Sequence, residues 1–249
     1  MMDLKLVWRA LKTRHRDQVH ELRAIRIALR QGGMALDVGA NKGSYLYSMA
    51  RWARGTPVVA FEPQGSLAHY LAAACRRSGL VNVTVENLAL SNQQGDLDLF
   101  VPGDSHSPGA SLEAGIAART TCRRETVKVT TLDDYAAAHI RLPVRVIKID
   151  VEGHEQAVLQ GALLLIRRDK PLLVIECEGR HLPLGQTVHD FLSQVVSLGY
   201  TATLAMPGKG ELPAAEFRED VHQKQVGERF WDARDYYNNF IFRPVAEPA

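Results

Sequence analysis

The amino-acid sequence predicts an α/β protein with a doubly wound, mostly parallel sheet, preceded by a helical extension. Short apolar runs alternate with stretches of helical periodicity along most of the 249 residues, which is the pattern of repeated strand and helix units. Several runs are apolar throughout, as expected for strands that helices cover on both faces. The first run leads into a glycine-rich turn, so ligands are expected beyond the carboxyl ends of the strands.

Composition narrows the class of protein further. The chain is 46% hydrophobic and 23% charged, which excludes disordered, collagen-like and disulfide-scaffold proteins. Its three cysteines have no CxxC spacing, and no apolar run approaches the roughly 20 residues that span a bilayer. We therefore expect a cytoplasmic protein, and a net charge of only +2 does not favour nucleic acid as a partner.

Residues 1–33 are predicted to form a basic, amphipathic helical extension, and residues 34–249 the main domain. One helical stripe recurs at alternating spacings of four and three: Leu4, Trp8, Leu11, His15, Gln18, Leu22, Ile25 and Leu29. Gly32 and Gly33 then end the pattern. The extension holds eight Lys or Arg against three acids, so it carries a charge of +5 and the rest of the chain −3.

The extension allows two interpretations. Its apolar side chains either pack on the main domain or pair across a homodimer; they are Trp8, Leu11, Leu22, Ile25 and Leu29. Alternatively, the basic helix binds peripherally to an anionic membrane at its inner face, with Trp8 at the interface. The sequence leaves both interpretations open.

The elements of the main domain follow from the same periodicities. Strands are predicted at 34–38, 58–61, 81–90, 97–101, 126–130, 144–149, 172–176, 200–205 and 240–243. Helices are predicted at 44–54, 66–78, 132–140, 155–168 and 187–198. The run at 81–90 is rich in β-branched residues, and the strands at 97–101 and 126–130 are expected to pair with each other.

The turn after the first strand, from Asp37 to Gly43, lets the backbone approach a ligand closely before a helix begins. It does not match the dinucleotide-binding pattern, because Asn41 and Ser44 occupy the second and third glycine positions. It does not match a phosphate-binding P-loop either, because Lys42 precedes its glycine. The turn therefore indicates a nucleotide-like ligand without naming it.

Glu62 is the second indication of a ligand. It lies 25 residues after Asp37 at the end of the second predicted strand, where a carboxylate accepts hydrogen bonds from both hydroxyls of a ribose. S-adenosylmethionine fits this pair of features better than a nicotinamide dinucleotide. It has an amino group for Asp37 and no pyrophosphate that would require three glycines.

Five segments resemble, in order and spacing, the FkbM family of S-adenosylmethionine-dependent methyltransferases: LDVGANKG at 36–43, FEP at 61–63, NLALS at 87–91, TLDD at 131–134 and KIDVEGHE at 148–155. The resemblance covers about residues 34–180, and VLQGA at 158–162 and PLLVIE at 171–176 extend it. It implies a class I methyltransferase (Rossmann-like) fold that methylates hydroxyl oxygens of sugars, glycolipids or secondary metabolites.

The resemblance also implies which residues bind the cofactor. They are Asp37, Gly39, Asn41 and Gly43 for the methionine part, Glu62 for the ribose, and Asn87 with the backbone near Ala89 for the adenine. For Asn87 the alternative is a turn residue that closes the third strand.

Acidic side chains gather where two neighbouring strands are predicted to end. They are Asp150, Glu152 and Glu155 after one strand, with His154 among them, and Glu176 and Glu178 after the next. Removing the proton of an acceptor hydroxyl needs a base or a metal, and like charges raise one another's pKa values. The catalytic candidates are Asp150, Glu152 and His154, and the candidate Mg²⁺ ligands are Asp150, Glu176 and Glu178.

The acceptor is expected to be a small molecule or a glycan. Enzymes of this fold that methylate exocyclic amines of nucleic acid usually carry an Asn/Asp-Pro-Pro-Tyr motif, which this chain lacks. Segments 102–125 and 207–239 are expected to select the acceptor through Arg119, Arg123, Arg124, Trp231, Tyr236 and Tyr237. Two other functions stay open: a scaffold protein that binds S-adenosylmethionine without turnover, and a nicotinamide-dependent oxidoreductase, which the glycine pattern disfavours.

Overall fold

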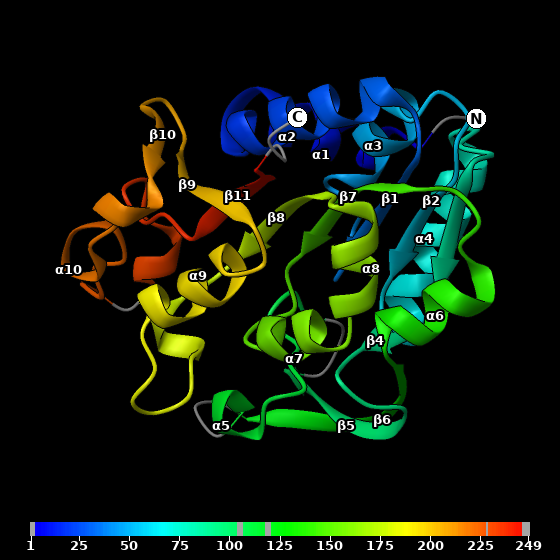
Figure 1. Ribbon diagram of the computed structural model, residues 1–249. Helices are drawn as coiled ribbons and strands as arrows, with labels where there is room; N and C mark the ends of the chain where they lie inside the picture. Colours follow the sequence, from blue (N-terminus) through cyan, green and yellow to red (C-terminus); the bar gives the residue numbers. More distant parts are fainter. Residues whose placement is uncertain (1–2, 104–106, 118–120, 228, 246–249) are drawn as a thin grey trace.

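The computed structural model describes residues 3–103, 107–117, 121–227 and 229–245, and within them eight strands form a central sheet that helices cover on both faces (Figure 1). The strand order is β10-β9-β11-β8-β7-β1-β2-β3. Neighbours from β8 to β3 are parallel, whereas β11 runs antiparallel to β8 and β9, and β10 pairs antiparallel with β9. The predicted doubly wound, mostly parallel sheet is confirmed.

The strands at the centre of this sheet are buried along nearly their whole length. The sheet consists of β1 (Met34–Val38), β2 (Val58–Phe61), β3 (Val83–Glu86), β7 (Val144–Ile149), β8 (Leu172–Glu176), β9 (Tyr200–Met206), β10 (Gly210–Pro213) and β11 (Asn239–Pro244). Burial on both faces explains the continuous apolar runs in the sequence.

Two apolar cores lie on the two faces of the sheet. One face carries α1 (Leu4–Lys12), α2 (Val19–Ala28), α3 (Leu46–Trp52) and α4 (Gly65–Arg77). The other carries α6 (Leu132–His139), α7 (Glu155–Gln160), α8 (Leu163–Asp169) and α9 (Val188–Val196). Two short helices, α5 (Ala114–Ala117) and α10 (Glu219–His222), lie in the connections.

A second, three-stranded sheet interrupts the alternation. It consists of β4 (Ala89–Leu90), β6 (Cys122–Thr130) and β5 (Gly95–Pro102), and the antiparallel pairing of β5 with β6 is as predicted. The predicted strand at 81–90 is split between the two sheets. Asn87 lies at the break, where its side-chain amide donates to the carbonyls of Glu62 and Pro63.

The predicted helix at 155–168 is likewise two helices, α7 and α8, which meet at Gly161. A Cβ atom on Gly161 would lie 2.1 Å from the carbonyl oxygen of Ser91. This close approach of the chain after β4 ends α7, and the apolar periodicity carries no sign of it. Strand β10 was also outside the sequence prediction.

The extension is helical, as predicted, and α1 and α2 flank a π-helical turn at Thr13–Asp17. Leu22, Ile25 and Leu29 are buried, as the packing interpretation predicts. Helix α1 lies differently, because Trp8 is 64% exposed and Leu11 47% exposed. The prediction that these two pack on the main domain is wrong.

The π-helical turn explains this error. A π turn holds more residues than an α turn, and Gln18 after it leaves helical angles, with φ −128° and ψ 55°. The stripe therefore changes face between the two helices. In α1 the buried side chains are Leu6 and Ala10. Within the described ranges, none of the helices has the length and apolar character that a membrane crossing requires.

The orientation of α1 can be tested by a matched pair of substitutions. Leu6→Ala should lower the free energy of unfolding by about 2–4 kcal/mol, because the side chain is fully buried. Leu4→Ala should change it by less than about 0.5 kcal/mol, because that side chain is 71% exposed. Urea unfolding measures both values, and equal costs would contradict the observed orientation.

Candidate functional site

The glycine turn at the end of β1 sets the geometry of the site. Gly39 and Gly43 have φ of 77° and Asn41 has φ of 47°, in the left-handed region that Gly and Asn adopt most readily. A Cβ atom on Gly39 would lie 1.8 Å from the carbonyl oxygen of Asp150. The Asp150 N–H donates to the carbonyl of Val38 at 3.1 Å. Gly39 therefore lets the ends of β1 and β7 meet.

Gly43 has a packing role in the same turn. A Cβ atom there would lie 2.7 Å from Cδ1 of Leu71 and 2.9 Å from Cδ1 of Leu6. The guanidinium of Arg9 donates to the carbonyl of Lys42 at 3.2 Å. Helix α1 thus supports the turn from behind.

Glu62 follows β2 and is only 2% exposed. Its carboxylate accepts the backbone N–H of Asn41 at 2.8 Å and that of Gln64 at 2.9 Å. Burial raises its pKa, and these two hydrogen bonds oppose the shift. Asn87 donates to the carbonyls of Glu62 and Pro63, so it positions this carboxylate.

A buried lysine joins the ends of β1 and β7. Lys148 is 4% exposed, and its Nζ donates to Oδ2 of Asp150 at 2.8 Å and lies 4.0 Å from Oδ1 of Asp37. The same Nζ lies 5.0 Å from the centre of the Tyr45 ring. Burial alone would lower the pKa of Lys148, but the charges of Asp150 and Asp37 outweigh it and raise that pKa.

Asp37 is the most buried carboxyl of this group. It is 1% exposed, and its Oδ1 has no hydrogen-bond partner within the described part of the chain. Burial raises the pKa of Asp37 to about 6, although Lys148 opposes the shift. Such an atom has room for one further hydrogen-bond donor.

Three acids meet at the carboxyl ends of β7 and β8. Asp150, Glu152 and Glu176 each offer an oxygen, and these oxygens lie within 4.8 Å of one another. Glu152 has φ of 52°, which turns its side chain back toward the other two acids. Burial and the charge of Asp150 raise the pKa of Glu152 to about 8 and that of Glu176 well above its usual range. Glu152 and Glu176 therefore hold protons at neutral pH.

The side chain of Glu178 does not join this cluster of three acids. Its carboxylate pairs with Arg180 and accepts hydrogen bonds from the Tyr236 hydroxyl and the Asn238 amide, each at 2.8 Å. Burial opposes ionisation, but Arg180 outweighs it and lowers the pKa of Glu178. Of the three predicted Mg²⁺ ligands, Asp150 and Glu176 thus lie together, with Glu152 beside them, and Glu178 does not join them.

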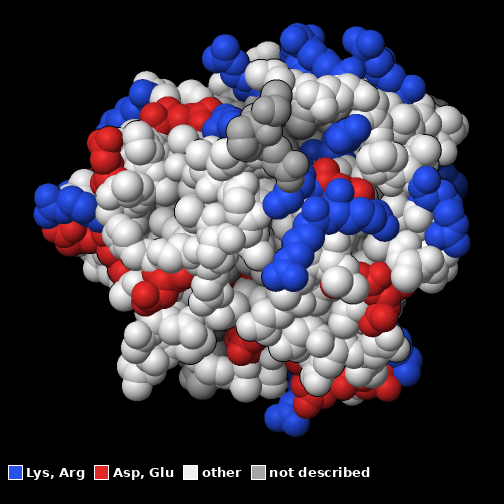
Figure 2. Space-filling view, viewed as in Figure 1, with Lys and Arg blue, Asp and Glu red and all other residues white. Residues whose placement is uncertain are grey.

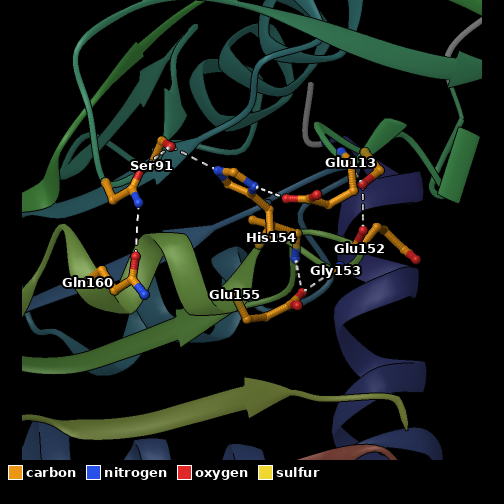
Figure 3. Close-up of polar contacts among 10 residues, drawn as sticks. Ser91, Glu113, Glu152, Gly153, His154, Glu155 and Gln160 are labelled. Atoms are coloured by element: carbon orange, nitrogen blue, oxygen red, sulfur yellow. Dashed lines mark hydrogen bonds and ion pairs between the residues drawn. The ribbon is translucent and has the colours of Figure 1, made fainter. Parts of the chain in front are cut away.

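His154 has both ring nitrogens engaged, one toward Glu113 and the other toward Ser91 (Figure 3). Its Nδ1 lies 2.6 Å from Oε1 of Glu113, and its Nε2 lies 2.9 Å from Oγ of Ser91. Glu155 accepts the backbone N–H of Gly153 at 3.2 Å and so fixes the turn that carries His154. These contacts favour a positioning role for His154 over the predicted catalytic one.

A pocket opens at this edge of the sheet between the glycine turn and the acids. The predicted site residues that line it are Gly39, Asn41, Glu62, Ala89, Asp150, Glu152 and Glu176. Those that do not line it, and instead pack or hydrogen-bond behind it, are Asp37, Gly43, Asn87, His154 and Glu178. Phe61, Leu88, Leu90 and Leu112 add apolar wall.

Glu176 also lines a second cavity, which therefore adjoins the first. Its walls come from the two ends of the chain: Arg16, Gln18 and Glu21 from the extension, and Trp231, Arg234, Tyr236, Tyr237, Asn238 and Asn239 from the predicted acceptor segment. In the other predicted segment, Arg123 pairs with Glu125 and Arg124 with Asp98, and Arg119 lies outside the described residues.

Sequence reasoning missed Lys148 and Glu21. A lone lysine inside an otherwise apolar strand is the signal that could have indicated the first. Glu21 is 1% exposed, and burial raises its pKa to about 7. Its Oε2 has no hydrogen-bond partner in the described ranges. No pattern in the sequence indicates that Glu21 and Glu176 line the same cavity.

Residues 37–201 match the model of the methyltransferase FkbM domain. The structure is similar to methyltransferase FkbM from Methylobacillus flagellatus, with a TM-score of 0.53 and 19% identity over 85% of this chain, but this chain covers only 43% of that protein. No curated protein matches the sequence.

Two further solved structures are similar over 99% of this chain. One is an O-methyltransferase from Bacillus cereus in complex with SAH, with 14% identity, a TM-score of 0.52 and 93% of that chain covered. The other is the O-methyltransferase TomG from Streptomyces achromogenes in complex with SAM, with 12% identity, a TM-score of 0.52 and 92% covered. At these identities the likeness establishes a Rossmann-like class I methyltransferase fold. The match over residues 37–201 goes further, and the chain belongs to the FkbM methyltransferase family.

Proposed function

We propose that this protein is an S-adenosylmethionine-dependent O-methyltransferase that acts on a hydroxyl of a sugar, a glycolipid or a related secondary metabolite. One observation carries the proposal. A single pocket has the carboxylate of Glu62 on one wall and the acids Asp150, Glu152 and Glu176 on another. Family membership and O-methyltransferases of the same fold support it.

The residues present fit the cofactor. Glu62 can accept from ribose hydroxyls, and Phe61, Leu88 and Leu90 give an apolar surface for the adenine. Asp37 lies behind the pocket wall, and its unpartnered Oδ1 suits a contact with the amino group of the methionine part through a water. When bound, S-adenosylmethionine supplies a methyl group on a positively charged sulfur.

Asp150 is our choice for the base. Lys148 donates to its Oδ2, which leaves Oδ1 to accept the proton of an acceptor hydroxyl. Glu152 and Glu176 hold protons of their own at neutral pH, so they suit hydrogen bonds to the acceptor better than proton abstraction. His154 and Glu155 hold the turn on which Asp150 and Glu152 lie.

The second cavity is the proposed acceptor site, because it meets the first at Glu176. Trp231 and Tyr237 offer aromatic faces to a sugar ring, and Glu21, Glu176 and Asn239 offer hydrogen bonds to hydroxyls. Such a lining suits a hydroxyl-rich molecule. A duplex nucleic acid would need a broad basic surface instead.

Cofactor binding is the direct test of the proposal. Isothermal calorimetry should show binding of S-adenosylmethionine and of its demethylated product, S-adenosylhomocysteine, and none of NADH. Glu62→Gln should weaken binding by roughly ten- to a hundredfold, the loss expected for hydrogen bonds to a charged group. Asp98→Asn, an exposed acid of the second sheet, is the control. Absence of binding by the folded wild-type protein would refute the proposal.

Asp150→Asn should reduce methyl transfer by at least about a hundredfold, because the base is lost, with cofactor affinity unchanged within a few-fold. Transfer of radiolabelled methyl groups to a cell extract measures the rate. Near wild-type transfer by the variant would contradict the assignment.

The cluster of Asp150, Glu152 and Glu176 also offers hard oxygen ligands to Mg²⁺, so the alternative to a side-chain base is a bound metal. Chelation of metal ions distinguishes the two mechanisms. We expect EDTA to leave transfer unchanged. Loss of transfer that Mg²⁺ restores would favour the metal and replace the side-chain mechanism.

Glu152→Gln should raise stability at high pH but not at low pH. Burial raises the pKa of Glu152 to about 8 in the folded state, from 4.5 in the unfolded chain. Its contribution to stability is therefore complete below pH 4.5 and is lost as the pH rises through 8. The glutamine variant escapes this loss, so its Tm should match wild type at acidic pH and exceed it by about 2 °C or more above the pKa. A pH-independent difference would contradict the raised pKa.

A further inference from the structure

Helix α1 presents its most apolar stripe to solvent. Leu4, Trp8 and Leu11 follow one another at spacings of four and three and are 71%, 64% and 47% exposed. The opposite face, with Leu6 and Ala10, packs on the protein. A helix that only packs on the protein core would bury its most apolar stripe. The exposed stripe therefore indicates a contact with something outside the chain.

Positive charge accompanies this stripe. Lys5 and Lys12 lie along one side of it on α1, and the exposed arginines that follow in the chain are Arg16, Arg23, Arg26 and Arg30. Figure 2 shows Lys and Arg along the edge of the molecule where Figure 1 draws α1 and α2. Of the described acidic side chains in this extension, Asp3 pairs with Arg77 and Glu21 is buried. The described outer surface of the extension is therefore apolar and basic.

We propose that this surface binds an anionic lipid bilayer, with α1 lying in the plane of the interface. Leu4, Trp8 and Leu11 would enter the headgroup region, where tryptophan is favoured, while the cations remain at the phosphate level. Lys12 already lies with its Nζ 5.9 Å from the centre of the Trp8 ring. A second copy of the chain fits less well, because it would bring two basic extensions together.

The inference extends to the acceptor if the proposed function holds. Arg16 follows α1 directly and lines the proposed acceptor cavity, so a bilayer bound by α1 would lie close to the rim of that cavity. This arrangement suits a lipid-linked glycan acceptor. The binding itself does not depend on catalysis.

Vesicle sedimentation of the full chain tests the proposal. The protein should sediment with vesicles of phosphatidylcholine mixed with phosphatidylglycerol, should not sediment with phosphatidylcholine alone, and should bind more weakly as salt increases. A triple variant, Leu4→Ser with Trp8→Ser and Leu11→Ser, should bind at least about tenfold more weakly, as should Lys5→Glu with Arg23→Glu.

A matched control removes exposed apolar side chains elsewhere: Leu164→Ser with Leu184→Ser, which are 70% and 107% exposed in the wild type. This variant should sediment like wild type, and circular dichroism should show that every variant is folded. Failure of the folded wild type to sediment at low salt would overturn the proposal, as would equal binding by the triple variant. A wild-type dimer that the triple variant converts to monomer, without vesicle binding, would assign the stripe to self-association instead.

None of these vesicle experiments needs turnover. Vesicle binding can therefore fail while cofactor binding and methyl transfer remain, and cofactor binding or methyl transfer can fail while vesicle binding remains. The two proposals are therefore separable.

Discussion

The ion pair between Lys148 and Asp150, with Asp37 next to it, is the interaction on which the rest of the site depends. It joins the ends of β1 and β7, the two central strands whose carboxyl ends carry the glycine turn and the acids. Removing the lysine would leave Asp37 buried without a cation, and a buried charge that loses its partner costs about 3–5 kcal/mol. The close approach of Gly39 to the Asp150 backbone depends on the same junction.

Two cavities lie next to this junction. One lies over the glycine turn and Glu62, the other beneath the C-terminal aromatics and the N-terminal extension, and Glu176 lines both. Transfer of a methyl group requires donor and acceptor atoms to meet about 3 Å apart in line. In the proposed function, the wall at Glu176 that both cavities share is where the methyl donor and the acceptor meet.

The sequence predicted the sheet and most of the pocket, because parallel strands end at one edge and bring Asn41, Glu62 and Asp150 together. It could not predict which face of α1 packs, because a single π-helical turn changes the phase of the stripe. The contacts of His154 were equally hidden, since Ser91 and Glu113 lie 63 and 41 residues away in the chain. Long-range packing, rather than local periodicity, decides such positions.

The protonation state of Lys148 is the measurement that tests this account most directly. Nuclear magnetic resonance of lysine labelled at its terminal carbon, assigned with Lys148→Arg, follows the side chain through a pH titration. The account predicts that Lys148 remains an ammonium ion beyond its ordinary pKa of 10.5, because Asp150 and Asp37 stabilise the charge against burial. A neutral amine at lower pH would contradict the account, because Asp150 and Asp37 would then lack the positive charge that stabilises them.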